Sequence, residues 1–249
     1  MNEPAAAIRL DHVSKAFGAF RVLDDVSLSI PRGRATVVLG RSGTGKSVML
    51  RHIVGLLQPD AGRVFVGDAE ITALPPAGLA KVRQRIGFLF QNAALFDSIT
   101  VAENVAFPLR RHTTLSDAEV RARALDKLAS VGLMRAAESM PGALSGGMRK
   151  RAGLARAMAL DPAILLVDEP SAGLDPVTSE EIDDLLVRVK QERGTTLIVV
   201  THNIPSARRI ADTMLFLYEG RVLARGTAED LERSEHELVR RFMQSEAGG

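Results

Sequence analysis

The chain contains no cysteine, which excludes disulfides, thiolate metal sites and cysteine nucleophiles. Long apolar runs are also lacking. None reaches the roughly 18 residues of a membrane-spanning helix, and residues 1–7 lack the cationic start and apolar core of a signal peptide. Neither charge dominates, since 32 lysines and arginines nearly balance 30 aspartates and glutamates. We therefore expect a protein that stays in the cytoplasm, does not take nucleic acid as its main partner, and reaches a membrane only through another protein.

The length of 249 residues suffices for a large core, in one domain with an insertion or in two small domains. Apolar runs of strand character alternate with segments of helical periodicity. Strands are predicted at residues 8–13, 22–30, 35–39, 63–66, 86–90, 164–167, 196–201, 214–218 and 221–224. Helices are predicted at residues 48–57, 116–132 and 149–160, from residue 176 onward, and at the end, where Leu231, Leu238, Val239, Phe242 and Met243 suggest an amphipathic helix. This alternation predicts an α/β fold with a mostly parallel sheet covered on both faces, and a helical insertion at residues 92–161.

A glycine-rich turn follows the buried strand at residues 35–39 and leads directly into a helix. Glycines let the backbone wrap closely, so that successive N–H groups and a helix N-terminus face a polyphosphate. A lysine then reaches the β- and γ-phosphates, and a serine hydroxyl holds Mg²⁺. The predicted phosphate-binding residues are Gly40, Arg41, Ser42, Gly43, Thr44, Gly45, Lys46, Ser47 and Val48. The alternative, a glycine turn beside a surface lysine, is disfavoured by the strand that precedes it.

Two acids, Asp168 and Glu169, end the apolar strand at residues 164–167. Nucleotide hydrolysis needs an acid to anchor Mg²⁺ and a base or positioning group for the attacking water. Because neighbouring strand residues point in different directions, Asp168 can serve the metal while Glu169 faces the γ-phosphate. Solvated acids are common where a strand ends, so this pair supports nucleotide chemistry only together with the glycine-rich loop.

A second phosphate-facing motif, Leu144-Ser145-Gly146-Gly147-Met148, opens the helix before the acidic strand. A serine and two glycines at a helix N-terminus suit an anion, yet the chain already has one phosphate loop. The simplest use of this motif is a second nucleotide. The alternative is a tight helix-capping turn.

With this order of motifs the chain resembles the nucleotide-binding subunits of ATP-binding-cassette (ABC) transporters over nearly its full length. The resemblance implies the P-loop ABC ATPase fold, with a core at residues 1–91 and 162–230 that includes an antiparallel β subdomain. It also implies a helical signature subdomain at residues 92–161 and a C-terminal helix and tail at 231–249. The expected ligands are ATP and Mg²⁺. The expected partners are a second copy in a head-to-tail dimer and two integral-membrane permease subunits, which hold this chain at the inner face of the membrane. A substrate-binding subunit and a small regulatory subunit are further candidate partners.

Carried over by position, the resemblance assigns further residues to the site. Phe17 stacks on adenine where the family usually has tyrosine, and Val22 packs beside the base. Gln91 senses Mg²⁺ and the γ-phosphate, Asp175 ends a loop that crosses the dimer interface, and His202 holds Glu169 in line. Ser47, Gln91 and Asp168 thus form the predicted metal site, and Glu169, His202, Lys46 and Gln91 the catalytic set. Each of these residues also has a purely structural alternative. Phe17 could be a core aromatic, Gln91 the end of a surface strand and His202 a helix cap.

Two positions depart from the usual family pattern. Met148 stands where most members have glutamine, and Asn203 stands where an aspartate usually follows the histidine. Because Ser145-Gly146-Gly147 is intact, we expect activity to survive both changes. The signature with its methionine and the segments 40–50 and 95–109 resemble the corresponding segments in the ATPases of lipid-asymmetry and mammalian-cell-entry-type transporters. Those transporters move phospholipid or other hydrophobic molecules across the bacterial envelope.

Three other functions compete with a lipid transporter. The chain could energise amino-acid uptake, since such ATPases are close relatives. It could be a soluble ABC ATPase serving iron–sulfur delivery, DNA maintenance or translation, but the coiled-coil insertion and the second cassette that would favour the last two are absent. A P-loop kinase would leave Ser145, Gly146 and Gly147 without a role.

The stretch after Gln91 is predicted to dock a membrane subunit. It carries more large apolar residues than a solvated loop needs, namely Leu95, Phe96, Ile99, Val101, Phe107, Pro108 and Leu109. An apolar cleft beside a nucleotide sensor could receive a short permease helix. The competing explanation is that these residues form the core of the helical insertion.

Overall fold

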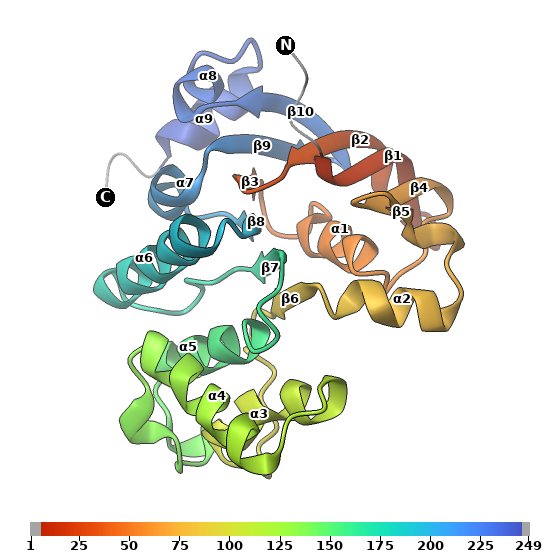
Figure 1. Cartoon of the computed structure of the whole chain (residues 1–249). Helices are drawn as coiled ribbons and strands as arrows, with labels where there is room; N and C mark the ends of the chain where they lie inside the picture. Colours follow the sequence, from red (N-terminus) through yellow and green to blue (C-terminus); the bar gives the residue numbers. More distant parts are fainter. Residues whose placement is uncertain (1–5, 246–249) are drawn as a thin grey trace.

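The computed structural model describes residues 6–245, so the first five and last four residues of the predicted core and tail lie outside the described residues. Figure 1 shows a central sheet, a second sheet beside it, and a group of helices at one end of the molecule. No helix within residues 6–245 combines the length and apolar character needed to cross a bilayer.

The central sheet has six strands in the order β10-β9-β3-β8-β7-β6. Their bounds are β3 (Ala35–Leu39), β6 (Ile86–Leu89), β7 (Ile164–Asp168), β8 (Thr196–Thr201), β9 (Thr213–Tyr218) and β10 (Arg221–Gly226). All neighbours are parallel except β10, which pairs antiparallel with β9 in a hairpin. Every residue of β3, β7 and β8 is buried, which explains why these strands read as unbroken apolar runs.

A second, antiparallel sheet has the order β2-β1-β4-β5, with β1 (Ala6–Phe17), β2 (Phe20–Pro31), β4 (Ala61–Val66) and β5 (Ala69–Glu70). Helix α1 (Lys46–Ile53) packs between the two sheets, because Met49, Leu50 and Ile53 share one hydrophobic cluster with both. Side chains alternate along β8 between this cluster and a second one on the opposite face of the central sheet. The predicted parallel sheet, covered on both faces, is therefore present.

The remaining helices cover the central sheet or form the group at its end (Figure 1). They are α2 (Pro76–Arg83), α3 (Val101–His112), α4 (Asp117–Ser130), α5 (Gly146–Ala157), α6 (Pro176–Arg193), α7 (Ile204–Ile210), α8 (Ala228–Glu232) and α9 (Glu237–Gln244), with short 3₁₀ turns at Ile71–Ala73, Met134–Ala136 and Pro141–Ala143. Helices α3, α4 and α5 lie together, away from the antiparallel sheet. Helix α5 begins three residues before the predicted start because Ser145 caps its N-terminus.

The predicted single terminal helix is wrong. The structure has two short helices there, with Leu231 in α8 and Leu238 to Met243 in α9. Between them the backbone turns, and Arg240 of α9 donates hydrogen bonds to the carbonyl groups of Ser234 (2.6 Å) and Glu235 (3.1 Å). Leu231, Val239 and Met243 nevertheless all enter the same core. Helix α1 is also shorter than predicted and ends before Gly55.

A buried side chain fixes the loop that leads into α3. Asn104 is fully buried, accepts a hydrogen bond from the backbone N–H of Phe96 (2.8 Å), and donates to the carbonyl groups of Phe96 (3.0 Å), Ile99 (3.3 Å) and Thr100 (3.0 Å). One amide thereby pairs with four backbone groups of residues 96–100, a segment without regular structure of its own.

We expect Asn104→Ala to lower the free energy of unfolding by about 1–3 kcal/mol, because it leaves buried backbone groups without partners. Urea unfolding followed by circular dichroism would measure the change. Arg111→Ala, an exposed substitution on the same helix, should stay within about 0.5 kcal/mol of the original chain. Equal midpoints for both variants would contradict the role given to Asn104.

Candidate nucleotide-binding site

A pocket of ≈ 410 Å³ lies where the carboxyl ends of β3, β7 and β8 meet the antiparallel sheet. It is lined by Phe17, Val22, Ser42, Gly43, Gly45, Lys46, Ser47, Val48, Gln91, Glu169 and His202. The sequence analysis predicts each of these residues as part of a nucleotide site, although they are spread over five separate stretches of the chain. Phe17 is about half exposed, at 49%, so one face of its ring is free to stack on a planar base.

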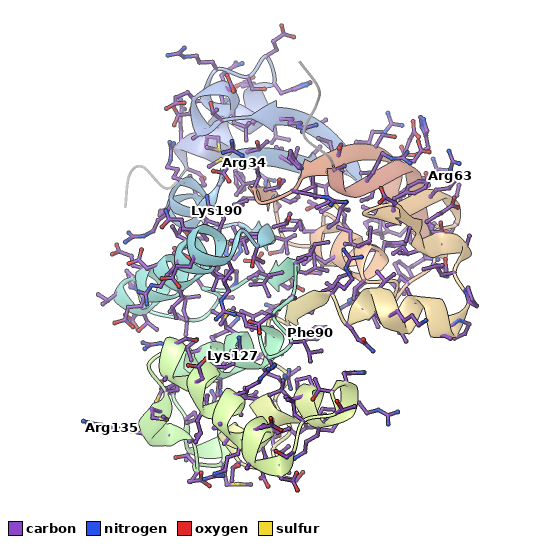
Figure 2. All side chains as sticks on the ribbon, in the orientation of Figure 1. Arg34, Arg63, Phe90, Lys127, Arg135 and Lys190 are labelled. Atoms are coloured by element: carbon purple, nitrogen blue, oxygen red, sulfur yellow. The ribbon has the colours of Figure 1, made fainter. Side chains whose placement is uncertain are left out.

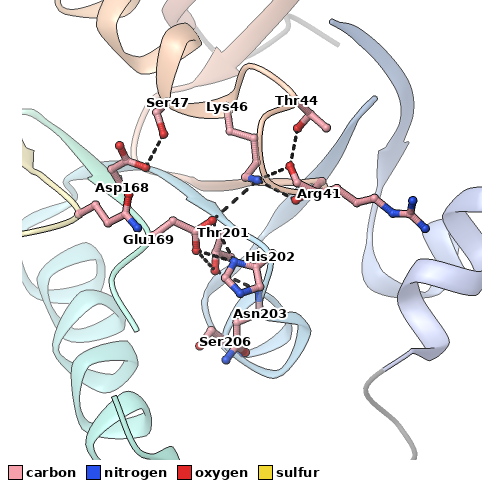
Figure 3. A network of polar contacts seen from close by, with 12 residues as sticks. Arg41, Thr44, Lys46, Ser47, Asp168, Glu169, Thr201, His202, Asn203 and Ser206 are labelled. Atoms are coloured by element: carbon pink, nitrogen blue, oxygen red, sulfur yellow. Dashed lines mark hydrogen bonds and ion pairs between the residues drawn. The ribbon is translucent and has the colours of Figure 1, made fainter. Parts of the chain in front are cut away.

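The glycine-rich loop between β3 and α1 has the conformation that its sequence predicts. Gly45 has φ +98°, and a Cβ at this position would lie 2.6 Å from the carbonyl oxygen of Val22, so no other residue fits. The Lys46 ammonium is buried and donates hydrogen bonds to the carbonyl groups of Gly40 (2.7 Å) and Arg41 (2.9 Å) (Figure 3). Burial lowers the pKa of Lys46, and the nearby charges of Glu169 and Asp168 oppose this. The loop thus holds a cation at its centre.

A hydroxyl and a carboxylate meet beside this loop. The Ser47 hydroxyl donates to Asp168 Oδ1 at 2.8 Å, and Asp168 is 5% exposed at the end of β7. Burial raises the pKa of Asp168, while the hydrogen bond from Ser47 acts in the opposite direction. A serine oxygen and a carboxylate oxygen at this separation are the hard donors that Mg²⁺ prefers, and Mg²⁺ commonly takes only one or two protein ligands. The donor set therefore fits the predicted metal.

Hydrogen bonds fix both the backbone and the side chain of Glu169. Its backbone has φ +45°, a left-handed conformation that is strained for a residue with a Cβ, and its N–H donates to the carbonyl of Val200 (2.9 Å). The Thr201 hydroxyl donates to Glu169 Oε2 at 3.1 Å, and His202 Nδ1 lies 3.0 Å and 3.1 Å from the two carboxylate oxygens (Figure 3). With the proton on Nδ1, His202 donates to the carboxylate. The predicted pair of Glu169 and His202 is thus in direct contact.

The two departures from the family pattern have structural explanations. Asn203 caps α7, because its side chain accepts a hydrogen bond from the Ser206 N–H (2.8 Å) as an aspartate would. Its own N–H donates to Thr201 Oγ1 (3.0 Å), which also bonds Glu169. Met148 packs its side chain against the hydrophobic core, and its N–H donates to the Ser145 hydroxyl (3.2 Å). Neither change disturbs the loop or the acids.

The signature residues do not line this pocket. Ser145 and Gly146 are exposed at the N-terminus of α5, and Asp175 is exposed as the cap of α6. A Cβ on Gly147 would lie 2.4 Å from Thr178 Cγ2, so glycine is required where α5 meets α6. The structure therefore brings together the predicted loop, acids, glutamine and histidine. It leaves Ser145, Gly146 and Asp175 on a separate, open surface, with Gly147 buried beside them.

Two contacts near the acids were missed from the sequence. Thr201 supports the Glu169 side chain, and the buried Lys150 donates to the backbone carbonyl groups of Gln91 and Glu169. A threonine that ends an apolar strand beside the candidate histidine was a usable signal. Lys150 gave none, because a lysine in a helix is most often solvated.

Comparison with known proteins places these features in a family. Residues 23–172, more than half of the chain, match the ABC transporter family. The chain is 43% identical over 237 residues to the probable ribonucleotide transport ATP-binding protein mkl of Mycobacterium tuberculosis, and this match spans 95% of this chain but 66% of that protein. It is 39% identical over 245 residues to the intermembrane phospholipid transport system ATP-binding protein MlaF of Escherichia coli, spanning 98% of this chain and 91% of that protein.

Solved structures agree. A dimeric, post-hydrolysis state of the ATP-binding cassette MJ0796 bound to ADP and Pi superposes with a TM-score of 0.83 at 36% identity, covering 88% of this chain and 98% of that one. CbiO1 from Clostridium perfringens, part of the ABC transporter complex cbiONQ, gives a TM-score of 0.81 at 28% identity, covering 95% of this chain and 98% of that one. The predicted fold class is confirmed. The chain belongs to the ABC transporter family and has the fold of its ATP-binding cassette.

Proposed function

We propose that this chain binds and hydrolyses ATP as the nucleotide-binding subunit of a membrane transporter that moves phospholipid or another hydrophobic substrate. One observation carries the proposal: a single pocket gathers the phosphate loop, Gln91, Glu169 and His202 around a space of ≈ 410 Å³. The name of the MlaF relative favours phospholipid as the substrate class. The name of the mkl relative favours ribonucleotide as a second candidate.

Each group in the pocket has a task that follows from its position. The loop N–H groups and Lys46 hold the β- and γ-phosphates, and Phe17 with Val22 receives the base. Ser47 and Asp168 would hold Mg²⁺, which neutralises charge on the phosphate oxygens when bound. Gln91, exposed at the rim of the pocket, is placed to sense this occupancy.

Glu169 is the group that handles the attacking water. Its two oxygens accept hydrogen bonds from Thr201 and His202, which fix the carboxylate and leave its remaining lone pairs for a water molecule. The Lys46 ammonium lies 3.8 Å from Glu169 Oε1, so the carboxylate also faces the cation at the centre of the phosphate loop. Holding the carboxylate before the reaction removes the cost of orienting it during the reaction.

A second copy of the chain completes the site. Ser145, Gly146 and Gly147 lie outside the pocket, at a helix N-terminus that suits phosphate, and Ser145 and Gly146 are exposed there. In a head-to-tail dimer, these residues of one copy close on the ATP held by the loop of the other. The dimeric state of the MJ0796 cassette supports this arrangement.

A groove of ≈ 570 Å³ between α2, β6 and α3 is the proposed docking site for the membrane subunits. Phe88 and Phe90 stack in it with ring centroids 4.1 Å apart, and Phe96 and Phe107 face each other at 5.0 Å; Phe90 is labelled in Figure 2. Phe96 and Phe107 are 45% and 49% exposed, so the two adjacent rings offer apolar surface to a partner.

The other residues predicted for this docking stretch divide between core and groove, except Ile99, which is partly buried and belongs to neither. Val101 and Leu109 are fully buried and belong to the core, and Leu95 packs against it. Pro108 lines the groove with the two exposed rings. The docking proposal therefore narrows to Phe96, Phe107 and Pro108. A chain docked in this way would lie at the cytoplasmic face of the membrane.

The central test is Glu169→Gln. We expect this variant to bind ATP normally but to hydrolyse it about 10²–10⁴-fold more slowly, because the phosphate loop and metal ligands remain while the water loses its acceptor. Lys46→Ala should instead weaken ATP binding itself. Phosphate release and binding of a fluorescent ATP analogue would measure the two effects. Turnover by Glu169→Gln at the original rate would refute the role of Glu169.

ATP should bring two copies of Glu169→Gln together, because slow hydrolysis preserves the closed state. Adding Ser145→Arg should abolish this dimer and leave ATP binding by the monomer intact, since the new side chain occupies the place of the partner's phosphates. Ser130→Arg, on the exposed end of α4, is the matched control. Light scattering would report the mass with and without ATP. If Glu169→Gln with Ser145→Arg and Glu169→Gln with Ser130→Arg showed the same ATP-dependent mass, the dimer proposal would be wrong.

Charge in the groove should release the membrane partner. Phe96→Asp and Phe107→Asp each remove an apolar anchor worth about 1.5–3 kcal/mol, so affinity should fall about 10- to 100-fold. ATP binding by the purified chain should not change. Met134→Asp, equally exposed at 50% but outside the groove, is the control. Co-purification from membranes is the measurement. If both groove variants fold and keep the partner, docking lies elsewhere and a soluble ATPase is favoured.

A further inference from the structure

Lys150 lies on the helix that starts at the signature, yet its side chain points to the chain's own nucleotide pocket. Ser145 caps the exposed end of α5, and Lys150 follows five residues later, 6% exposed. Its ammonium donates hydrogen bonds to the backbone carbonyl of Gln91 and, at 2.8 Å, to that of Glu169. A single buried cation thus joins three elements: the signature helix, the exit of β6 and the exit of β7.

The charge of Lys150 is balanced without an ion pair. Within residues 6–245 its ammonium contacts no carboxylate, and only the two carbonyl oxygens accept its hydrogen bonds. Burial lowers the pKa of Lys150, and the charges of Asp168 and Glu169 act against this shift. Because a buried cation is costly, its position depends on those carbonyl groups and on the acids behind them. Movement of α5 would therefore displace the backbone of Gln91 and Glu169 in the nucleotide site.

Both carbonyl groups belong to residues whose placement matters. Glu169 has the strained left-handed backbone described above, and its carbonyl otherwise accepts only a 3.3 Å hydrogen bond from the Ala172 N–H. After Gln91, Ala93 and Ala94 are also left-handed, and Arg156 of α5 donates to both of their carbonyl groups at 2.8 Å. Helix α5 thereby holds the main chain of both loops, and Lys150 is the contact shared between them.

We propose that Lys150 is a positioning residue that couples the two ATP sites of the dimer. The inference rests on the proposed function, since it needs head-to-tail closure. The N-terminal end of α5 meets the partner's ATP at Ser145, and one turn later Lys150 fixes Gln91 and Glu169 of the same chain. Closure on one nucleotide thus sets the carboxylate and the glutamine that serve the other nucleotide.

Lys150→Met tests this role, because it keeps the length and apolar stem of the side chain but removes both hydrogen bonds. We expect ATP affinity within about twofold of the original chain, since Lys150 touches no residue of the phosphate loop. A displacement of catalytic groups of about 1 Å can cost 10²-fold in rate, so kcat should fall about 10²-fold. The Hill coefficient of hydrolysis should fall to 1. Lys150→Arg, which can reach both carbonyl groups, should restore most of the rate.

Lys127→Met is the matched control. Lys127 is also a buried lysine, 4% exposed on the neighbouring helix α4 (Figure 2), but its partner is Asp161, outside the nucleotide pocket. It should lower thermal stability as much as Lys150→Met does, with kcat and the Hill coefficient unchanged. Equal losses of kcat in both variants would mean that Lys150 merely stabilises the helical group, and the inference would fall.

Mixed dimers identify the site on which Lys150 acts. In a dimer of one Glu169→Gln copy and one hydrolysing copy, Lys150→Met should slow hydrolysis only when it is in the hydrolysing copy. Loss from the silent copy alone would instead make Lys150 a support for the signature, and would overturn the inference. If the original chain neither hydrolyses ATP nor dimerises, the proposed function fails; if it does both and Lys150→Met keeps its kcat, only the coupling role fails.

Discussion

The parallel direction of β3, β7 and β8 is the constraint on which the site depends. Because these strands pair in register and run the same way, their carboxyl ends meet at one edge of the sheet. β3 delivers the phosphate loop there, β7 delivers Asp168 and Glu169, and β8 delivers Thr201 and His202. Residues more than a hundred positions apart thus contact one another without any long loop.

The sequence allowed prediction of those parts that local chemistry determines. Gly45 permits a backbone that a Cβ would block, and Asp175 and Ser145 cap helices, so these positions carry their own signals. Contacts made only after packing were not predictable. Leu231, Val239 and Met243 enter one core from two separate helices, although their spacing fits a single helix as well. Lys150 gains its partners only when α5 lies against two strand ends. Helical periodicity alone cannot distinguish one bent segment from two.

The docking groove shows the same limit. An excess of apolar residues after Gln91 predicted a contact surface, but composition could not separate Leu109, which is buried, from Phe107, which is exposed two residues earlier. The position of Phe96 depends on a contact that composition does not reveal. The Asn104 amide fixes the backbone of Phe96, whose ring lies beside Phe107. A polar residue in the core thereby determines the shape of an apolar surface.

The left-handed backbone at Glu169 has a consequence for how this site can change over time. Glycine is the residue that would relieve the strain of φ +45°, which costs about 1–2 kcal/mol for other residues. Glycine would also remove the carboxylate that Thr201 and His202 hold. Selection for stability and selection for turnover therefore pull in opposite directions at this position, and a lineage that lost the need to hydrolyse nucleotide would be free to drift toward the more stable chain.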